Sequence, residues 1–196
     1  MNNYMGAYWR SRDGTMHTFP TVYPRIQPLL LLELRFNRRF MQESLERELR
    51  RAARSSRPLG GILLDIDHFK QFNDSYGHEA GDIVLRELGG FLQSQIRHED
   101  VACRLGGEEF LLILPDTSLD VTRQRAEKLR EASKRVSIQY GGRPLGGITL
   151  SMGVIVFPVH GTTCDVILRS ADEALYQAKL QGRDCVVVAK PAQEAA

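Results

Sequence analysis

Four acidic side chains occur in two short clusters that could bind a divalent metal ion. Asp65 and Asp67 flank one isoleucine at the end of an apolar run, and Glu108 and Glu109 follow the glycine pair Gly106-Gly107. Neighbouring carboxylates raise each other's pKa unless a positive charge lies between them. Mg²⁺ or Mn²⁺ suits such ligands, and magnesium takes its other ligands from water and substrate phosphates. The two clusters therefore predict a metal site that receives a phosphorylated substrate.

Three basic residues could bind the phosphates of such a substrate. Lys70 closely follows the first acidic cluster, and Lys179 and Arg183 lie four residues apart near a predicted helix end. Each feature also has an ordinary explanation. Glutamates beside a glycine turn are commonly solvated, Asp-x-Asp is a common turn signal, and the basic pair could merely interact with the helix dipole. The combination of features, not any one of them, favours a site.

Two neighbouring strands are needed to bring the acidic clusters together. The aspartates end a predicted strand, Gly60–Asp67, in which alternate residues share a face. The glutamates lie at the tip of a predicted hairpin, Val101–Leu105 and Glu109–Leu114, in which Gly106-Gly107 forms the turn. Glycine supplies the positive φ angles that two-residue hairpin turns require. We expect this hairpin to pair beside the first strand.

Helices and a second hairpin account for most of the remaining chain. The predicted elements are a helix from an Asn37 N-cap to about Ser56, a helical turn over Phe69–Ser75, helices over Glu79–Ile96, Ser118–Val136 and Asp165–Gln181, a hairpin of Ser137–Tyr140 with Ile148–Phe157, and a strand over Cys185–Val188. This order predicts an α+β domain with helices on one side of a largely antiparallel sheet.

Composition favours one globular domain with a hydrophobic core. The chain has 196 residues, of which 42% are hydrophobic and 26% charged. Residues 1–28 have three prolines and no periodicity, so we expect an irregular N-terminal arm there. No apolar run approaches the length of a membrane span, and the first residues lack a secretory signal. Three scattered cysteines fit reduced thiols, so we expect a cytoplasmic protein.

Charge is unevenly distributed along the chain. Arg38 to Arg57 includes seven arginines but three glutamates, whereas residues 58–196 have 15 basic and 19 acidic residues. The excess of acidic residues over 58–196 argues against nucleic acid as a partner. The arginine-rich helix could contact nucleic acid or anionic lipid, but Met41, Leu45 and Leu49 recur at helical spacing. We therefore expect these apolar residues to be buried and the arginines to form a solvated face.

The motifs of the chain resemble those of a known family. GGEEF at Gly106–Phe110 is similar to the signature of GGDEF domains, the diguanylate cyclases that join two GTP molecules into cyclic di-GMP. Leu63–Asp82, Leu150–Val154 and Ala171–Asp184 resemble the other family blocks in order and spacing. The resemblance implies a ferredoxin-like α+β sandwich, akin to nucleotide-cyclase palms, over residues 29–190, followed by a tail at 191–196.

The same resemblance implies roles for particular residues. Asp65, the backbone carbonyl of Ile66, Glu108 and Glu109 would hold two Mg²⁺ or Mn²⁺ ions in each active site, and Glu108 could also accept a proton. Lys70 would stabilise charge in the transition state. Asn73 and Asp82 would contact the guanine edge of the substrate. The phosphates would be contacted by Gly106, Gly107, Lys179 and Arg183. His78 would also bind substrate, and its alternative role is to cap the next helix.

The resemblance further implies a homodimer and product inhibition. Each domain would hold one GTP, so the 3′-hydroxyl of one must attack the α-phosphorus of another across a dimer. Arg97 and Asp100 form an RxxD motif, which at this offset before Gly106 is the family's inhibitory site for cyclic di-GMP. An arginine can pair bidentately with phosphate or guanine.

Two departures from the family pattern leave alternatives open. The usual DxLTGL block is replaced by LLLELRF at Leu30–Phe36, and Asp184 stands where asparagine is more usual. The first departure bears on efficiency and activation, whereas the fold is expected to be kept. The alternatives to a cyclase are a receptor that binds cyclic di-GMP through Arg97 and Asp100, and a module that only dimerises or binds GTP.

Overall fold

The structure is a computed structural model that describes residues 8–10, 16–18 and 38–192. The chain divides into two compact units, residues 1–33 and 34–196. In the first unit, β1 (Tyr8–Arg10) pairs antiparallel with β2 (Met16–Thr18). The predicted N-cap Asn37 lies outside the described residues, as does Leu30–Phe36, the segment that differs from the family's usual DxLTGL block. The boundaries predicted at 28, 29 and 190 stay predictions.

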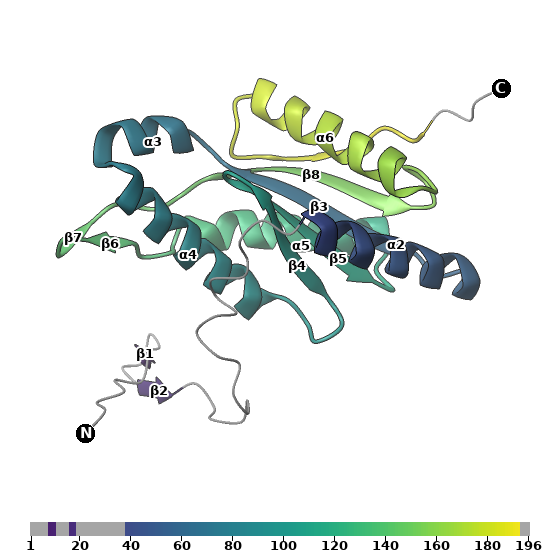
Figure 1. The fold of residues 1–196 in the computed structure, drawn as a ribbon, viewed down its shortest axis with the longest axis horizontal. Helices are drawn as coiled ribbons and strands as arrows, with labels where there is room; N and C mark the ends of the chain where they lie inside the picture. Colours follow the sequence, from purple (N-terminus) through teal and green to yellow (C-terminus); the bar gives the residue numbers. More distant parts are fainter. Residues whose placement is uncertain (1–7, 11–15, 19–37, 193–196) are drawn as a thin grey trace. The chain divides into compact units, whose positions relative to one another are not determined.

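The second unit is built on a five-stranded mixed sheet with the order β4-β5-β3-β8-β9 (Figure 1). Its strands are β3 (Leu59–Ile66), β4 (Val101–Gly106), β5 (Glu109–Pro115), β8 (Leu150–Phe157) and β9 (Val186–Val188). All neighbours are antiparallel except β8 and β9, which are parallel. The predicted α+β class is confirmed, and β3 occupies the centre of the sheet as the site requires.

Helices cover both faces of this sheet, so the expectation that they gather on one side is wrong. The helices are α2 (Arg38–Ser55), α3 (Phe69–Tyr76), α4 (His78–Gln95), α5 (Leu119–Ser133) and α6 (Cys164–Leu180). One buried cluster joins the sheet to α4 and α5, and the other joins it to α2 and α6. Because every residue of β3 and β8 is buried, both faces need a covering layer.

The second predicted hairpin is also wrong. Gln139–Tyr140 (β6) pairs with Arg143–Pro144 (β7) around a Gly141-Gly142 turn, and both glycines have positive φ. The long strand β8 pairs instead with β3 and β9. Two glycines between short segments favour the local pairing because they fit a two-residue turn directly. This leaves β8 free to form the centre of the sheet beside β3.

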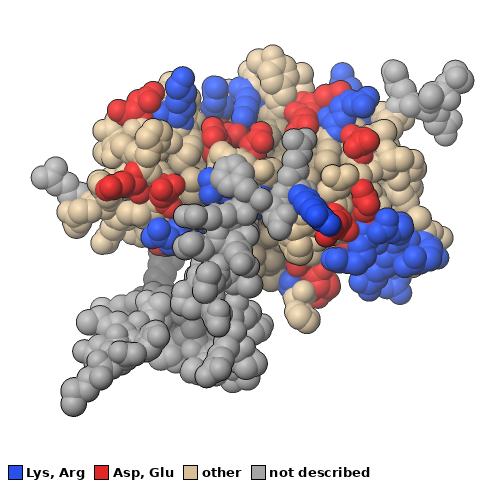
Figure 2. All heavy atoms as spheres, viewed as in Figure 1, with Lys and Arg blue, Asp and Glu red and all other residues tan. Residues whose placement is uncertain are grey.

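The surface charge follows the sequence prediction for the arginine-rich helix. Met41, Leu45 and Leu49 of α2 are buried, and Figure 2 shows basic side chains gathered over α2. Arg47, Arg50 and Arg51 pair with glutamates of the same helix, so much of this charge is locally balanced. Among the described residues, no helix has the length and apolar character needed to cross a membrane. The three cysteines are free thiols.

Candidate active site

Two of the predicted acids lie directly opposite each other on neighbouring strands. Asp65 of β3 and Glu109 of β5 are register partners, so their side chains leave the same face of the sheet. Asp65 is only 4% exposed. Lys179, near the end of α6, reaches this face and places its Nζ 2.9 Å from Asp65 Oδ2. The sheet and α6 thus bring together two carboxylates and one ammonium group, as the sequence predicts.

The ionisation of both carboxylates reflects their crowding. Burial, opposed by the hydrogen bond from Lys179, raises the pKa of Asp65 to about 6, with smaller contributions from Glu108 and Glu109. Burial also raises the pKa of Glu109; Lys179 counteracts this, whereas Asp172 and Glu108 add to it. One lysine therefore does not fully balance these acids. An additional cation would be stabilised at this end of the sheet.

The glycine turn differs from the predicted one by a single residue. Gly106 pairs with Glu109, so the two turn residues are Gly107 and Glu108, and Gly106 ends β4. Gly107 has φ +52°, a conformation that suits glycine. This shift places Glu108 at the tip of the turn and Glu109 within the strand. The two neighbouring glutamates consequently have different surroundings.

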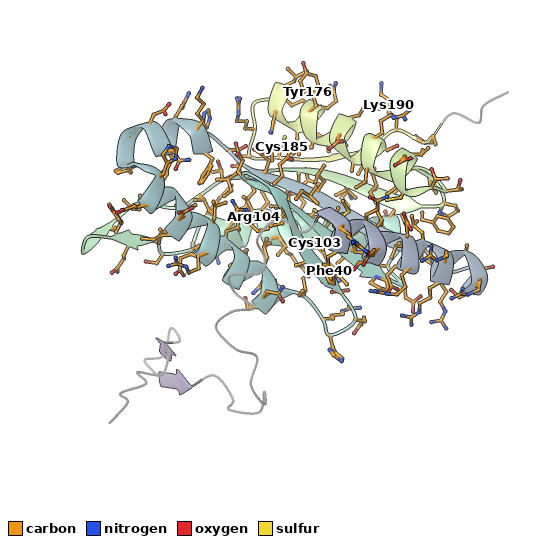
Figure 3. The ribbon with its side chains drawn as sticks, viewed as in Figure 1. Phe40, Cys103, Arg104, Tyr176, Cys185 and Lys190 are labelled. Carbon is orange, nitrogen blue, oxygen red and sulfur yellow. The ribbon has the colours of Figure 1, made fainter. Side chains whose placement is uncertain are left out.

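Arg104 fixes this turn, a role that the sequence did not suggest. Its Nε and Nη2 both donate to the carbonyl oxygen of Gly107, at 2.9 and 2.6 Å. Figure 3 shows Arg104 on β4, where that strand approaches the turn. Burial lowers the pKa of Arg104, while the charges of Asp82 and Glu108 oppose that change. Arg104 therefore lies between the acidic turn and the start of α4.

A second group of predicted residues meets where α3 and α4 pack together. Asn73 lies on α3, and its side-chain oxygen is buried without a hydrogen-bond partner among the described residues. It lies against Gly81 of α4, where a Cβ would come within 1.9 Å of Asn73 Oδ1. Asp82 is the next residue along α4. Asn73 thus offers an unpartnered carbonyl oxygen, and Asp82 an exposed carboxylate, and such acceptors can bind a ligand that offers N–H donors.

Asp67 has a structural role distinct from that of Asp65. It follows the end of β3, where its Oδ1 accepts a hydrogen bond of 2.6 Å from Ser151 Oγ. Its Oδ2 accepts one of 3.0 Å from the backbone N–H of Asp184. Asp67 thus connects β3 to β8 and to the segment after α6. The second aspartate of the first cluster holds the site together and does not join the acidic pair.

The remaining predicted substrate residues are exposed around this region. Lys70 lies in the first turn of α3, and Arg183 follows α6. His78 begins α4, but the N-cap is Gly77, and no side chain in the described part of the chain caps the start of this helix. The alternative role predicted for His78, that of a helix cap, is therefore wrong. All three side chains remain accessible to a ligand.

The two residues of the RxxD motif have very different surroundings. Arg97 is exposed, whereas the Asp100 side chain is fully buried. Asp100 Oδ2 accepts from the backbone N–H of Arg97 at 2.8 Å and from Arg125 Nη2 of α5 at 2.6 Å. The pairing with Arg125 was not predicted. Asp100 therefore stabilises the loop that presents Arg97.

The match to a family model decides how the whole arrangement is classified. Residues 35–185 match the family described as "Diguanylate cyclase, GGDEF domain". This range includes both strands of the acidic pair, the glycine turn and helices α2 to α6. The chain belongs to the GGDEF family. Within this GGDEF domain, the signature residues Gly106–Phe110 form the turn with Glu108 at its tip and the start of β5, where Glu109 lies.

Individual relatives agree with this classification. The chain is 43% identical over 153 residues to diguanylate cyclase DgcP of Pseudomonas aeruginosa, covering 78% of this chain and 22% of DgcP. Its structure resembles the GGDEF domain of YfiN (TpbB) from P. aeruginosa, with a TM-score of 0.76, 31% identity and coverage of 81% and 99% of the two chains. The chain spans between about a fifth and a third of the length of such curated relatives.

A third relative has been solved with a bound nucleotide. The GGDEF domain of DgcB from Caulobacter crescentus, in complex with cyclic di-GMP, has a TM-score of 0.72 to this chain. The two are 32% identical, and the match covers 78% of this chain and 87% of that one. These likenesses confirm the predicted family and fold class.

The acidic end of this GGDEF domain fits a magnesium ion that is only partly held by protein. Among the described residues, no group of three or more His, Cys, Asp and Glu side chains is arranged to hold a metal by itself. The adjacent carboxylates of Asp65 and Glu109 are nevertheless hard oxygen ligands with raised pKa values. Such a partial set suits magnesium, whose remaining ligands are water and substrate phosphates.

Proposed function

We propose that this chain is a diguanylate cyclase, which condenses two GTP molecules into cyclic di-GMP and releases two pyrophosphates. The observation that carries the proposal is the direct pairing of Asp65 with Glu109, beside Lys179 and close to the turn of Glu108. A buried acidic pair with a basic neighbour suits a nucleoside triphosphate and its metal ions. The cyclic di-GMP complex of the similar DgcB domain supports this substrate class.

Two magnesium or manganese ions would be held by Asp65, the Ile66 carbonyl, Glu108 and Glu109. When bound, these ions would offset charge on the phosphoryl oxygens and lower the pKa of the attacking hydroxyl. Glu108, at the tip of the turn, could accept the proton of that hydroxyl. Arg104 would hold the turn so that Glu108 keeps its position.

The other site residues would bind and orient the substrate. Lys179 and Arg183 would bind the triphosphate, with Gly106 and Gly107 close to it and Lys70 opposing charge that develops during transfer. Asn73 and Asp82 would read the guanine edge. A carboxylate can accept from the two adjacent N–H groups of guanine, which adenine does not offer. The unpartnered Asn73 oxygen and the exposed His78 complete this substrate-binding region.

The chemistry requires two copies of the domain. Each site would hold one GTP, and the 3′-hydroxyl of each would attack the α-phosphorus of the other. A homodimer with twofold symmetry presents the two nucleotides to each other equally. Product inhibition would act through Arg97, whose loop is held by the buried Asp100.

One assay separates this proposal from its alternatives. The purified chain is incubated with GTP and Mg²⁺, and the nucleotides are separated by chromatography. We expect cyclic di-GMP and pyrophosphate, with loss of product in Glu108→Gln. The matched control is Glu87→Gln, an exposed glutamate of α4, which should keep the activity. Absence of product in the wild-type chain would refute cyclase activity.

If that assay yields no product, a second measurement distinguishes the remaining functions. Binding of cyclic di-GMP that is lost in Arg97→Ala would identify a receptor. Binding of GTP alone, or dimerisation without either nucleotide, would identify a module that only dimerises or binds GTP. Calorimetry and analytical ultracentrifugation measure these properties directly.

A further inference from the structure

The segment that follows α6 has an unusual backbone conformation. Gly182, Arg183 and Asp184 have consecutive φ angles of +107°, +65° and +44°. The left-handed region is unfavourable for residues that have a Cβ, and Arg183 and Asp184 both have one. Contacts with the surrounding structure must therefore stabilise this conformation.

Those contacts come from two directions. On one side, the Asp184 N–H donates to Asp67 Oδ2 at 3.0 Å, and the Arg183 N–H donates to the Ala178 carbonyl at 3.1 Å. On the other side, Arg130 of α5 donates from Nη1 to both the carbonyl and Oδ1 of Asp184, at 3.1 and 2.7 Å. The backbone on either side of the Arg183 side chain is thereby fixed.

Charge strengthens the connection to α5. Lys134 Nζ lies 2.8 Å from Asp184 Oδ2, so each carboxylate oxygen of Asp184 faces a different cation. The Arg130 side chain is only 16% exposed, which shields its pairing from solvent. Arg130 also pairs with Glu127 and Glu131 of its own helix. These partners hold the guanidinium in place where it meets Asp184.

The Arg183 side chain itself is available to bind a ligand. Its side chain is exposed and has no ion-pair or hydrogen-bond partner among the described residues. Lys179, four residues earlier and still within α6, already reaches Asp65 at the acidic pair. The conformation of residues 182–184 determines where the Arg183 guanidinium can reach relative to that pair. A fixed backbone reduces the entropy lost when the guanidinium binds an anion.

We propose that Arg130 and Asp184 are positioning residues that hold Arg183 for the triphosphate of the substrate. Lys134 contributes to the same connection through its ion pair with Asp184. The inference rests on the proposed function, and it assigns to α5 a part in substrate binding. It also gives a role to Asp184, where asparagine is more usual in the family. Asparagine would keep the Oδ1 acceptor for Arg130 but lose the charge opposite Lys134.

The experiment is a double-mutant cycle on nucleotide affinity. Binding of 3′-deoxy-GTP, which lacks the attacking hydroxyl, is measured by calorimetry with saturating Mg²⁺ in the wild-type chain, Arg130→Met, Arg183→Met and the double variant. We expect each single variant to bind about tenfold more weakly, since small misplacements are costly at such sites. If Arg130 acts through Arg183, the double variant should be no weaker than Arg183→Met alone.

Arg123→Met is the matched control, because Arg123 is an exposed arginine of the same helix. It should bind like the wild-type chain. Asp184→Ala provides a second route if Arg130→Met does not fold, and it should lose about as much affinity as Arg130→Met. Asp184→Asn should restore affinity to within about twofold of the wild-type chain, since it keeps one acceptor.

The outcomes separate this inference from the proposed function. Additive losses in the double variant, unchanged affinity in Arg130→Met, or an equal loss in Arg123→Met would each overturn the positioning role. If the wild-type chain does not bind 3′-deoxy-GTP at all, the proposed function fails first and the inference fails with it. A failure of the positioning role is seen only in the variants, whereas a failure of the proposed function is already seen in the wild-type chain.

Discussion

The side-chain oxygen of Asn73 lies against the backbone of Gly81, with no room for a Cβ between the two helices. A Cβ built at position 81 would come within 1.9 Å of Asn73 Oδ1 and 3.1 Å of the Phe69 ring. Gly81 therefore determines where the proposed guanine-reading amide lies. A glycine inside a helix normally costs stability, so its presence here has a packing reason.

Gly81→Ala should displace Asn73 and weaken nucleotide binding. We expect affinity for GTP to fall about tenfold and the free energy of unfolding to fall by about 1–2 kcal/mol, as for other overpacked sites. Gly90→Ala is the control, because a Cβ there would meet no atom of the described residues within 4 Å. It should raise stability by about 0.5–1 kcal/mol through helix propensity and leave affinity unchanged. Calorimetry and thermal denaturation measure both effects.

The raised pKa of Asp65 predicts that the contribution of this residue to the stability of the metal-free chain is smaller at neutral than at acidic pH. Its folded-state pKa of about 6 exceeds the ordinary value of 3.8, so the folded chain binds this proton more tightly than the unfolded chain. The contribution of Asp65 to stability should therefore fall as pH rises from about 4 to about 6. Asp65→Asn should raise the free energy of unfolding by about 2 kcal/mol at pH 7.5 and by little near pH 4.

Denaturation of the metal-free chain at several pH values checks this expectation. Asp74→Asn, at an exposed position on α3, is the control and should show no such pH-dependent gain. Equal effects of the two variants at pH 7.5 would contradict the assignment to Asp65. In the wild-type chain, Mg²⁺ affinity should also decline below about pH 6, because the proton and the metal compete for the same carboxylate.

Arg104→Met should loosen the turn that carries Glu108. Both donors to the Gly107 carbonyl would be lost, and we expect the turnover rate to fall about tenfold. Amide hydrogen exchange at Glu108 and Glu109 should become faster, a readout that does not depend on activity. Arg86→Met, at an exposed position on α4, should change neither property. Unchanged exchange in Arg104→Met would show that the turn is stable without this arginine.

Asp100→Ala should destabilise the fold, whereas Arg97→Ala should not. Removing Asp100 leaves Arg125 without its carboxylate partner in a buried position, a change that typically costs about 3–5 kcal/mol. Arg97 is exposed, and its hydrogen bonds with Asp100 are made by the backbone: its N–H donates to Asp100 Oδ2, and its carbonyl accepts from the Asp100 N–H. Urea denaturation measures the difference. Product inhibition is therefore best tested with Arg97→Ala, since Asp100→Ala would confuse lost binding with lost structure.

The sequence predicted the acidic pairing because strand periodicity and the glycine turn are local signals. Asp65 and Glu109 lie on the strands expected to carry them, and the family motifs extend that prediction along the chain. The position of the turn was wrong by one residue, because either Gly106-Gly107 or Gly107-Glu108 can form a two-residue loop. Strand register, set by the whole sheet, decided between them.

The supporting arginines could not be predicted in the same way. Arg104, Arg125 and Arg130 contact groups whose proximity depends on how separate elements pack, and a long arginine side chain has no local signature. Gly81 did offer a signal, since an interior helix glycine suggests close packing. The sequence also carried a signal that both faces of the sheet are covered. The apolar runs of β3 and β8 do not alternate regularly with polar residues, which is typical of strands buried on both faces.

The pairing of Asp65 with Glu109 limits how the chain can change in length. The pairing of β3 with β5 places the Cα atoms of these two residues opposite each other, so strand register determines which face of the sheet their side chains share. Inserting one residue into β3 before Asp65, or into β5 after Glu109, would turn that carboxylate to the opposite face. Insertions should therefore be tolerated in the exposed Gly141-Gly142 turn between β6 and β7 but not within these strands. A library of single-residue insertions would map this boundary.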